Sequence, residues 1–307
     1  MYKVVCNFPL TKEDAAELQS VSKEYQFVFE RDLSAQIILG NTSATALRDY
    51  HNLRWFQTCS IGVDNYIKKG VLNDDVTLTN AVSVHSIPVA EHTLALILDL
   101  TKKLYRYRDN QTRHLWANEG MVKEYGEMKV CIVGFGNIGN ALAKMLKALG
   151  MYTIGVKRRM IDKPEYLDEL YTSEDLLKAI SDVDVVVSIL SGNKENEGFF
   201  TLDTFKAMRP DCIMINVGRG NLYSEETLKQ VLDEKIIAAV SSDVFVKEPL
   251  DGSSVLWDYR DLVITPHVAG GYHTESSKKA FVELCKENLR RFISNEELKN
   301  IVTIRET

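Results

Sequence analysis

The chain has few cysteines for its length, and none of them forms a C-x-x-C pair. Five are scattered through 307 residues, an odd number. A disulfide framework needs paired cysteines, so this pattern fits reduced thiols in the cytosol better. His85 and His92 have no third ligand at metal-binding spacing. We therefore expect reduced cysteines, no metal site, and a packing or hydrogen-bonding role for the two histidines.

Long apolar runs and excess positive charge are also missing. The longest apolar run, around 94–100, is interrupted by Asp99 and is too short to cross a bilayer. The first ten residues lack the charged start and long apolar core of a signal peptide, and they suit a strand. The formal net charge of -6 argues against a general surface for nucleic acid or anionic membranes. The sequence predicts a cytoplasmic protein that binds neither.

One glycine-rich motif lies between a predicted strand and a predicted helix. Apolar residues 130–133 suit a strand buried on both faces, and Gly134, Gly136 and Gly139 follow in G-x-G-x-x-G spacing. The first glycine permits a sharp turn, the second a close approach to a pyrophosphate, and the third close packing of the helix. An ordinary turn is the alternative, but the strand and helix that the motif requires are present. The motif predicts a dinucleotide site at Gly134, Phe135, Gly136, Asn137, Ile138 and Gly139.

Three adjacent cations follow the next predicted strand, 152–156. NAD-binding chains usually place an acid there, about 20 residues past the glycines, to bind the ribose hydroxyls. This chain has Lys157, Arg158 and Arg159 instead, which would pair with the extra phosphate of NADP. A solvated basic loop is the alternative, and the place at the strand end favours the phosphate. NADP is therefore the predicted cofactor, in preference to NAD.

Predicted strands and helices alternate along the whole chain, which indicates parallel sheets. Pro88 suits the first turn of a long helix that we expect to run toward Trp116, and a last helix is expected over about 274–291. No repeat, low-complexity tract or flexible linker interrupts the series. We predict an α/β protein of two doubly wound parallel-sheet domains with a cleft between them. They are a flavodoxin-like substrate domain (1–92 and 274–307) and a Rossmann cofactor domain (93–273).

Three side chains follow predicted strands of the second domain, where open α/β sheets bind their ligands. Arg219 lies between two glycines in a predicted turn, and its planar guanidinium can donate two hydrogen bonds to a carboxylate. His267 can exchange a proton near neutral pH, and we expect Glu248 to hydrogen-bond that imidazole and fix its tautomer. Taken one by one, each residue could instead have a purely structural role: a histidine is often structural, an arginine in a turn usually faces solvent, and a glutamate before proline can simply end a helix. Together with a nicotinamide site, they predict a catalytic site.

A further loop, Ser60 to Asp64, follows a short predicted strand in the first domain. Gly62 allows a tight bend whose successive backbone amides would form a small anion pocket. A plain turn at the end of a strand is the alternative, and the loop by itself leaves both open.

Taken together and in order, the motifs resemble the D-isomer-specific 2-hydroxyacid dehydrogenases, and more narrowly their NADP-preferring glyoxylate/hydroxypyruvate reductases. The likeness covers nearly the whole chain: SIGVD at 60–64, the helix start at 85–92, the glycine motif, NVGRG at 216–220, 243–250 and 264–270. One departure lies at 190–193, where LSGN replaces the usual Leu-Pro-x-Thr near the adenosine end of the cofactor. That departure leaves the details of the adenosine contact open.

The resemblance implies a role for each candidate residue. Arg219 would bind the substrate carboxylate and orient the oxo group, His267 would be the acid/base, and Glu248 would partner His267. Asp243 would bind the nicotinamide amide, and the amides of Gly62 and Val63 would hold the carboxylate. The substrate contacts would then be Ser60, Ile61, Gly62, Val63, Arg219 and His267, and the further cofactor contacts Val217, Gly218, Asp243 and Gly270.

The resemblance and the candidate sites together predict NADPH-dependent reduction of a 2-oxo acid to a D-2-hydroxy acid, and the resemblance implies a homodimer. The reductive direction is inferred from the basic residues at 157–159, because cytosolic NADP is generally kept reduced. The alternative is an NADP(H)-sensing binding protein of the corepressor type on the same fold. A formate or phosphite dehydrogenase would use NAD, which the basic run disfavours. The identity of the 2-oxo acid is left open.

Overall fold

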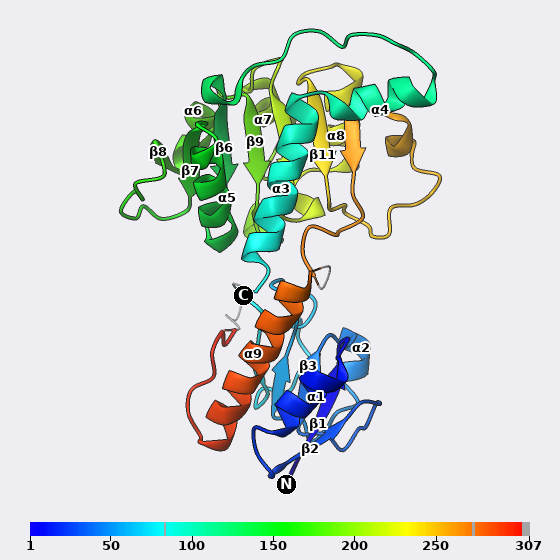
Figure 1. Cartoon of the computed structure of the whole chain (residues 1–307), viewed down its shortest axis with the longest axis vertical. Coiled ribbons are helices and arrows are strands. Elements are labelled where there is room, and N and C mark those ends of the chain that lie inside the picture. The colour runs from blue at the N-terminus through cyan, green and yellow to red at the C-terminus, as the bar shows by residue number, and fades with distance from the viewer. Residues whose placement is uncertain (83, 272–273, 303–307) are drawn as a thin grey trace. The chain divides into compact units, whose positions relative to one another are not determined.

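The protein forms two compact units, each built on one parallel sheet (Figure 1). The structure is a computed structural model that describes residues 1–82, 84–271 and 274–302. The first unit contains Met1–His85 and Gly271–Thr307, and the second contains Ser86–Gly270. The prediction of an α/β protein with two doubly wound parallel sheets is confirmed. The cleft expected between the domains stays a prediction.

The first unit has a five-stranded sheet in the order β2-β1-β3-β4-β5. This is the flavodoxin-like order, with a switch point between β1 and β3. Every pairing in the sheet is parallel. The elements of this unit are β1 (Tyr2–Asn7), α1 (Lys12–Gln19), β2 (Tyr25–Val28), β3 (Ile37–Gly40), α2 (Ala44–Leu47), β4 (Trp55–Gln57), β5 (Thr77–Thr79) and α9 (Glu275–Ile293).

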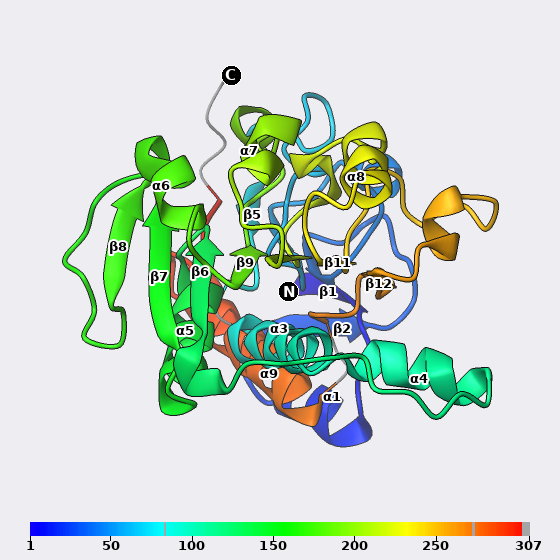
Figure 2. The same ribbon diagram turned by 90° about the horizontal axis from the view of Figure 1, so that it is seen from above.

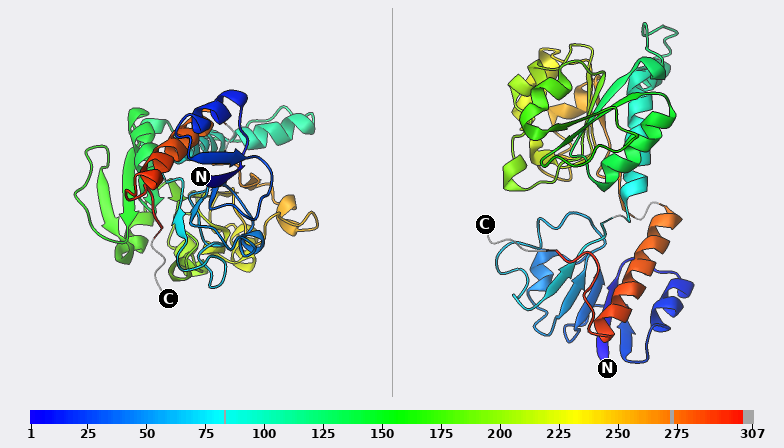
Figure 3. Two further views of the ribbon diagram at one scale, coloured as in Figure 1. Left: turned by 90° about the horizontal axis from the view of Figure 1, so that it is seen from below. Right: turned by 90° about the vertical axis from the view of Figure 1, so that its left-hand side faces the viewer.

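Helix α9 returns the end of the chain to the first unit, where it packs beside α1 on the sheet (Figure 3). The Thr274 side chain accepts a hydrogen bond from the Ser277 amide and so caps its N-terminus. The buried side of the helix presents Phe281, Cys285 and Leu289 to the strands. The observed helix runs two residues past the expected end, because its apolar face continues through Phe292 and Ile293.

The second unit has a seven-stranded parallel sheet in the order β12-β11-β10-β9-β6-β7-β8. Read from β8, this is the Rossmann order with one further strand. The strand order reverses between the parallel neighbours β6 and β9. Helices α3 and α5 cover one face, while α6, α7 and α8 cover the other (Figure 2). The strands are β6 (Lys129–Val133), β7 (Tyr152–Lys157), β8 (Glu169–Thr172), β9 (Val185–Ser188), β10 (Ile213–Asn216), β11 (Ala239–Ser242) and β12 (Leu262–Ile264).

The helices of the second unit show why the domain division lies where it does. They are α3 (Ser86–Thr101), α4 (Leu104–Thr112), α5 (Asn137–Ala148), α6 (Leu176–Ile180), α7 (Leu202–Lys206) and α8 (Glu225–Asp233), with short 3-10 turns η1 (Tyr125–Glu127), η2 (Ser173–Asp175), η3 (Lys194–Asn196), η4 (Gly220–Leu222) and η5 (Val255–Asp258). Helix α3 packs along its length on α5 and β10. The expected boundary after His92 would cut this helix, so the structure divides the chain before Ser86 and after Gly270 instead.

The prediction of a single long helix toward Trp116 is wrong. Helix α3 ends at Thr101, and Lys103 takes a left-handed conformation with φ 58° before α4 begins. The chain therefore turns, and α4 leaves the sheet near its edge strand β12 (Figure 2). None of the helices in the described part of the chain combines the length and apolar character that a membrane span would need.

Candidate active site

The glycine motif forms a tight connection between β6 and α5. Gly134 has φ 94°, and a Cβ there would lie 2.9 Å from the carbonyl carbon of Ile189. A Cβ on Gly139 would lie 3.1 Å from the ring of Phe135, so this glycine allows α5 to lie close to the strand. A Cβ on Gly136 would meet nothing nearer than 4.0 Å. The space over Gly136 is therefore open at the N-terminus of α5, where backbone amides favour a phosphate.

The other residues of the motif contribute differently. The Phe135 side chain is buried in the core beneath the loop, and Ile138 packs partly against the same core. The amides of Gly134 and Phe135 both donate to the Val156 carbonyl oxygen, 3.0 Å away. Asn137 begins α5. Phe135 and Ile138 therefore hold the loop in shape with their side chains, while Gly136 and Asn137 are exposed.

A pocket of about 310 Å³ opens beside this loop. Its size lies in the range of small-molecule sites, and it lies where the strand order reverses, the usual ligand position in such sheets. Lys157 and Arg158 line it, while Arg159 follows on the exposed bend. Arg158 forms an ion pair with Glu195, with 2.7 Å between Nη1 and Oε2. The remaining lining residues are Val133, Gly134, Phe135, Gly136, Val156, Ser173, Ile189, Leu190, Ser191, Asn196 and Phe199.

His267 and Glu248 form a hydrogen-bonded pair beyond the ends of β12 and β11. The Nδ1 atom of His267 lies 2.6 Å from Oε2 of Glu248. The other oxygen, Oε1, accepts a hydrogen bond from the Phe245 amide at 2.9 Å. A carboxylate only accepts, so Nδ1 carries the hydrogen and Nε2 is left for proton exchange with a ligand. The imidazole side chain is half exposed, which allows a ligand to reach it.

Asp243 fixes the backbone that carries this histidine. Its carboxylate is buried and accepts three hydrogen bonds, from the Thr265 hydroxyl at 2.6 Å and from the amides of Val268 at 2.9 Å and Ala269 at 3.0 Å. The His267 amide donates to the Asp243 carbonyl oxygen at 2.8 Å. His267 itself has φ 53°, a left-handed conformation that costs energy unless its neighbours impose it. Asp243 imposes it, a positioning role that its motif did not reveal.

Arg219 follows β10, the strand next to β11. Asn216 holds the turn from both sides, because its Nδ2 donates to the Arg219 carbonyl oxygen at 2.9 Å and its Oδ1 accepts from the Gly218 amide at 3.0 Å. The guanidinium Nη1 donates to the Gly218 carbonyl oxygen at 2.7 Å. A Cβ on Gly220 would lie 2.0 Å from the carbonyl carbon of Phe245, so only glycine fits beside the loop before Glu248.

The structure therefore brings the three catalytic candidates to one edge of one sheet. Arg219, Glu248 and His267 follow the neighbouring parallel strands β10, β11 and β12. The proposed cofactor contacts Val217 and Gly218 lie in the same turn as Arg219, and Gly270 ends the unit after His267.

The predicted substrate loop belongs to the first unit and is held at the end of β4. Asn41 organises it, because its Oδ1 accepts hydrogen bonds from the Thr58 hydroxyl at 2.7 Å and the Cys59 amide at 3.2 Å, while its Nδ2 donates to the Ser60 hydroxyl at 3.1 Å. Asn80 donates to the Ile61 carbonyl oxygen at 3.0 Å. Gly62 and Val63 continue this loop. Its approach to Arg219 and His267 stays a prediction.

His85 and His92 make hydrogen bonds, as expected. His85 Nε2 lies 2.7 Å from the Cys59 carbonyl oxygen, and burial lowers the pKa of His85. His92 Nε2 lies 3.4 Å from the Thr265 hydroxyl and 3.9 Å from Asp243, so it supports the loop of His267. Among the described residues, no group of three or more His, Cys, Asp or Glu side chains is placed to hold a metal ion.

The second unit thus combines a Rossmann sheet, a glycine-rich connection between strand and helix, and a hydrogen-bonded His–Glu pair, an arrangement typical of dinucleotide-dependent oxidoreductases. Residues 94–269 match the family model described as D-isomer specific 2-hydroxyacid dehydrogenase, NAD binding domain. A relative that is 31% identical over 251 residues, covering 79% of this chain and 73% of its own, is a probable 2-ketogluconate reductase of Dictyostelium discoideum. The chain belongs to the D-isomer-specific 2-hydroxyacid dehydrogenase family.

Two solved structures share this fold. A D-isomer specific 2-hydroxyacid dehydrogenase family protein from Aeromonas salmonicida superposes with a TM-score of 0.86 at 25% identity, over 99% of each chain. A probable 2-hydroxyacid dehydrogenase from Rhizobium etli, in complex with NADP, HEPES and L(+)-tartaric acid, gives a TM-score of 0.79 at 25% identity, again over 99% of each chain. The similarity therefore extends through both units.

Proposed function

We propose that the protein reduces a 2-oxo acid to a D-2-hydroxy acid with NADPH as the hydride donor. The observation that carries this proposal is the 2.6 Å hydrogen bond between His267 and Glu248, at the same sheet edge as Arg219. This arrangement supplies a proton donor and a carboxylate-binding cation beside a dinucleotide loop. The family membership and the similarity to a probable 2-ketogluconate reductase support a 2-oxo acid as substrate.

Each of the three residues would have a distinct task. When bound, the reduced nicotinamide supplies the hydride that adds to the carbonyl carbon. Arg219 holds the substrate carboxylate through paired donors and stabilises charge on the oxo oxygen. Nε2 of His267 gives its proton to that oxygen. Glu248, which accepts from Nδ1, keeps the ring oriented and stabilises the imidazolium before the proton leaves.

A nicotinamide dinucleotide fits the residues present. The open backbone at Gly136 and the first turn of α5 suit the pyrophosphate. Two cations, Lys157 and Arg158, line the pocket where an NAD-binding chain would carry an acid for the ribose. The Rhizobium etli structure contains NADP. These features support NADPH over NADH as the cofactor and, with it, the reductive direction.

Steady-state kinetics test the substrate and the cofactor together. Glyoxylate, hydroxypyruvate, pyruvate, 2-ketogluconate and branched or aromatic 2-oxo acids are assayed with NADPH and with NADH. The configuration of every chiral product is determined by chiral chromatography, while glyoxylate, whose product is achiral, reports turnover only. We expect one or more of these acids to give the D-product with NADPH. Much better use of NADH would contradict the cofactor assignment, and an L-product would contradict the reaction.

Replacing His267 with Ala separates the enzyme from a cofactor-sensing regulator. General acid–base catalysis contributes roughly 10² to 10⁴ in rate, so an enzyme loses turnover by about that factor. NADPH binding, measured by calorimetry, is expected to stay within about twofold of the native value. A protein that binds NADPH but reduces no 2-oxo acid even before the substitution would instead favour the regulator.

We further propose that the active form is a cytoplasmic homodimer joined through α4 and the segment after it. Several large apolar side chains of this segment are exposed to solvent: Leu104, Tyr107, Leu115, Trp116, Met121 and Val122. Trp116 is fully exposed beside a pocket of about 800 Å³ that extends from Tyr107 to Asn118. A patch of this kind next to a hollow suits a self-complementary contact with a second copy. The five cysteines are all buried as thiols, which suits the cytoplasm.

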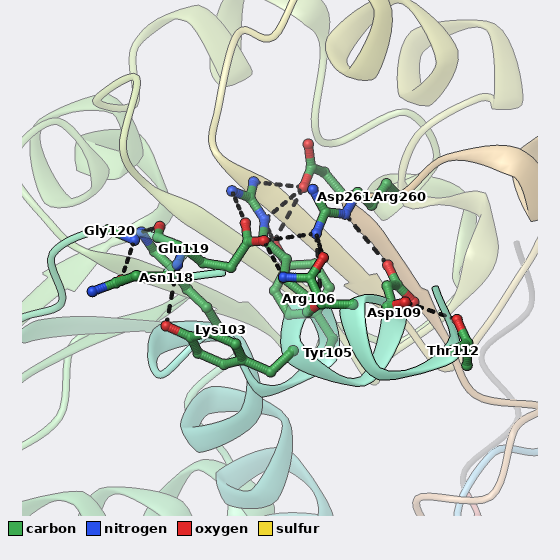
Figure 4. A network of polar contacts seen from close by, with 12 residues as sticks. Lys103, Tyr105, Arg106, Asp109, Thr112, Asn118, Glu119, Gly120, Arg260 and Asp261 are labelled. Atoms are coloured by element: carbon green, nitrogen blue, oxygen red, sulfur yellow. Dashed lines mark hydrogen bonds and ion pairs between the residues drawn. The ribbon is translucent and has the colours of Figure 1, made fainter. Parts of the chain in front are cut away.

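This segment has a fixed shape because a polar network ties it to β12 (Figure 4). Arg106 pairs with Asp261 at 2.6 Å, and Arg260 pairs with Glu119 at 3.0 Å. Asn110 donates to the same Glu119 carboxylate at 2.6 Å. Light scattering on a sizing column tests the dimer: we expect twice the 34.8 kDa of one chain, and a monomer after Trp116→Arg. A native chain that elutes as a monomer would refute this proposal.

A further inference from the structure

A carboxylate, that of Glu195, lies beside the pocket at the glycine loop, on a short turn. Glu195 lies in η3, the 3-10 turn that follows the departure from the family pattern at 190–193. Its Oε2 lies 2.7 Å from Nη1 of Arg158, one of the two cations that line the pocket. The acidic residue and the cofactor-binding cation are 37 positions apart in the sequence, so no local motif connects them.

The turn that presents Glu195 is fixed at both ends. The Asn193 side chain accepts a hydrogen bond from the Asn196 amide at 3.1 Å. Asn196, which is buried and lines the pocket, donates from Nδ2 to the Ser191 carbonyl oxygen at 2.8 Å. The residues that replace the family's usual segment thus build the turn. They place a negative charge against Arg158.

We propose that Glu195 is a specificity-determining residue that competes with the 2′-phosphate of NADP for Arg158. This inference rests on the proposed use of NADPH. A 2′-phosphate must displace the Glu195 carboxylate from the guanidinium and then lies near its negative charge. The ribose of NAD brings no phosphate and leaves the ion pair in place. Glu195 therefore lowers the preference for NADP over NAD below the value that Lys157 and Arg158 alone would give.

The expected effect is moderate, because both side chains are more than half exposed. Exposed ion pairs are weak and are screened by salt. We expect Glu195→Gln to tighten binding of a 2′-phosphate by about twofold to fivefold. The gain should shrink in high salt, since exposed charges are screened over roughly 8 Å at physiological ionic strength.

Calorimetric titration with cofactor fragments tests this without any turnover. The native protein and the Glu195→Gln, Glu197→Gln, Arg158→Gln and Arg158→Gln/Glu195→Gln variants are titrated with 2′,5′-ADP and with 5′-AMP. Glu197→Gln is the matched control, because it removes the same charge from the end of the same turn. We expect Glu195→Gln to tighten 2′,5′-ADP alone, the control to change neither ligand by more than about twofold, and the Glu195 effect to vanish when Arg158 is already Gln.

The two assignments fail in different ways. Unchanged or weaker 2′,5′-ADP binding by Glu195→Gln, while Arg158→Gln weakens it, overturns the role of Glu195 and leaves the phosphate site intact. Equal tightening of 5′-AMP overturns the competition for the phosphate. If Arg158→Gln leaves 2′,5′-ADP binding unchanged, the proposed NADP site is wrong and the inference falls with it.

Discussion

Replacing Glu248 with Gln tests the acid–base pair most directly, because the two side chains have nearly the same shape. The amide oxygen can keep the hydrogen bond from the Phe245 amide, now 2.9 Å long. The amide nitrogen then faces Nδ1 of His267, where the carboxylate now accepts at 2.6 Å. A donor therefore replaces an acceptor, and the negative charge that would stabilise the imidazolium is lost.

The size of the effect follows from that one contact. A hydrogen bond to a charged group contributes about 1.5–3 kcal/mol, which corresponds to a rate factor of roughly 10 to 150. We expect kcat/KM for the best 2-oxo acid to fall by about this factor, and KM for NADPH to change little. Global stability should change little as well, because Glu248 is partly exposed.

The assay follows NADPH oxidation at neutral pH, with NADP+ binding measured separately by calorimetry. Lys247→Gln is the control, since it alters the charge of the adjacent exposed residue without touching the imidazole. A Glu248→Gln enzyme with native kcat/KM would refute the assignment. Equal losses in the two variants would show that the loop, and not the hydrogen bond, matters.

Three further predictions address the residues around this pair. Arg219→Lys should lower kcat/KM by about 10²- to 10³-fold, because an ammonium cannot hold a carboxylate through two planar donors; native kinetics would contradict this. Asp243→Asn should lower the unfolding free energy by about 1–3 kcal/mol in denaturant titration and reduce activity, since one buried acceptor becomes a donor facing an amide. The pKa of Glu119 is lowered by hydrogen bonds from Asn110 and Arg260. The ionised Glu119 therefore stabilises the fold above the unfolded pKa of 4.5, and this stabilisation is lost as the pH falls through the lower folded pKa. Glu119→Gln should make Tm fall less steeply between about pH 5 and 3. An unchanged slope of Tm against pH would contradict this prediction.

Local patterns predicted the parts of the structure that depend on local geometry. The Gly134 turn and the helix after it follow from residue spacing within one strand–turn–helix unit. The positions of Glu248 and His267 at one edge of the sheet could be predicted because each lies in the loop that follows a strand, six residues past β11 and three residues past β12. The break at Lys103 could not be predicted, because neither glycine nor proline lies near it and Lys102, Lys103 and Leu104 all favour a helix.

Polar contacts between residues far apart in the sequence could not be predicted either. Asp243 reaches Val268 and Ala269 across 25 and 26 positions, and Glu195 reaches Arg158 across 37. Such pairs form only when the sheet has brought the strand ends together. A polar residue at the end of a buried strand is the one available signal: Asn216 is the last residue of β10, and Asn41 and Asp243 directly follow β3 and β11.

The strand order also predicts that cofactor choice and catalysis respond separately to mutation. Arg158 follows β7 and Glu248 follows β11, which are four strands apart in the sheet. At about 4.8 Å per strand the separation is roughly 19 Å, more than twice the screening length of about 8 Å at physiological ionic strength. Combining Glu195→Gln with Glu248→Gln should therefore multiply their effects on kcat/KM, to within about 0.5 kcal/mol. Steady-state kinetics of the four proteins measure this, and strong coupling would mean that the adenosine and nicotinamide ends communicate through the structure rather than through charge.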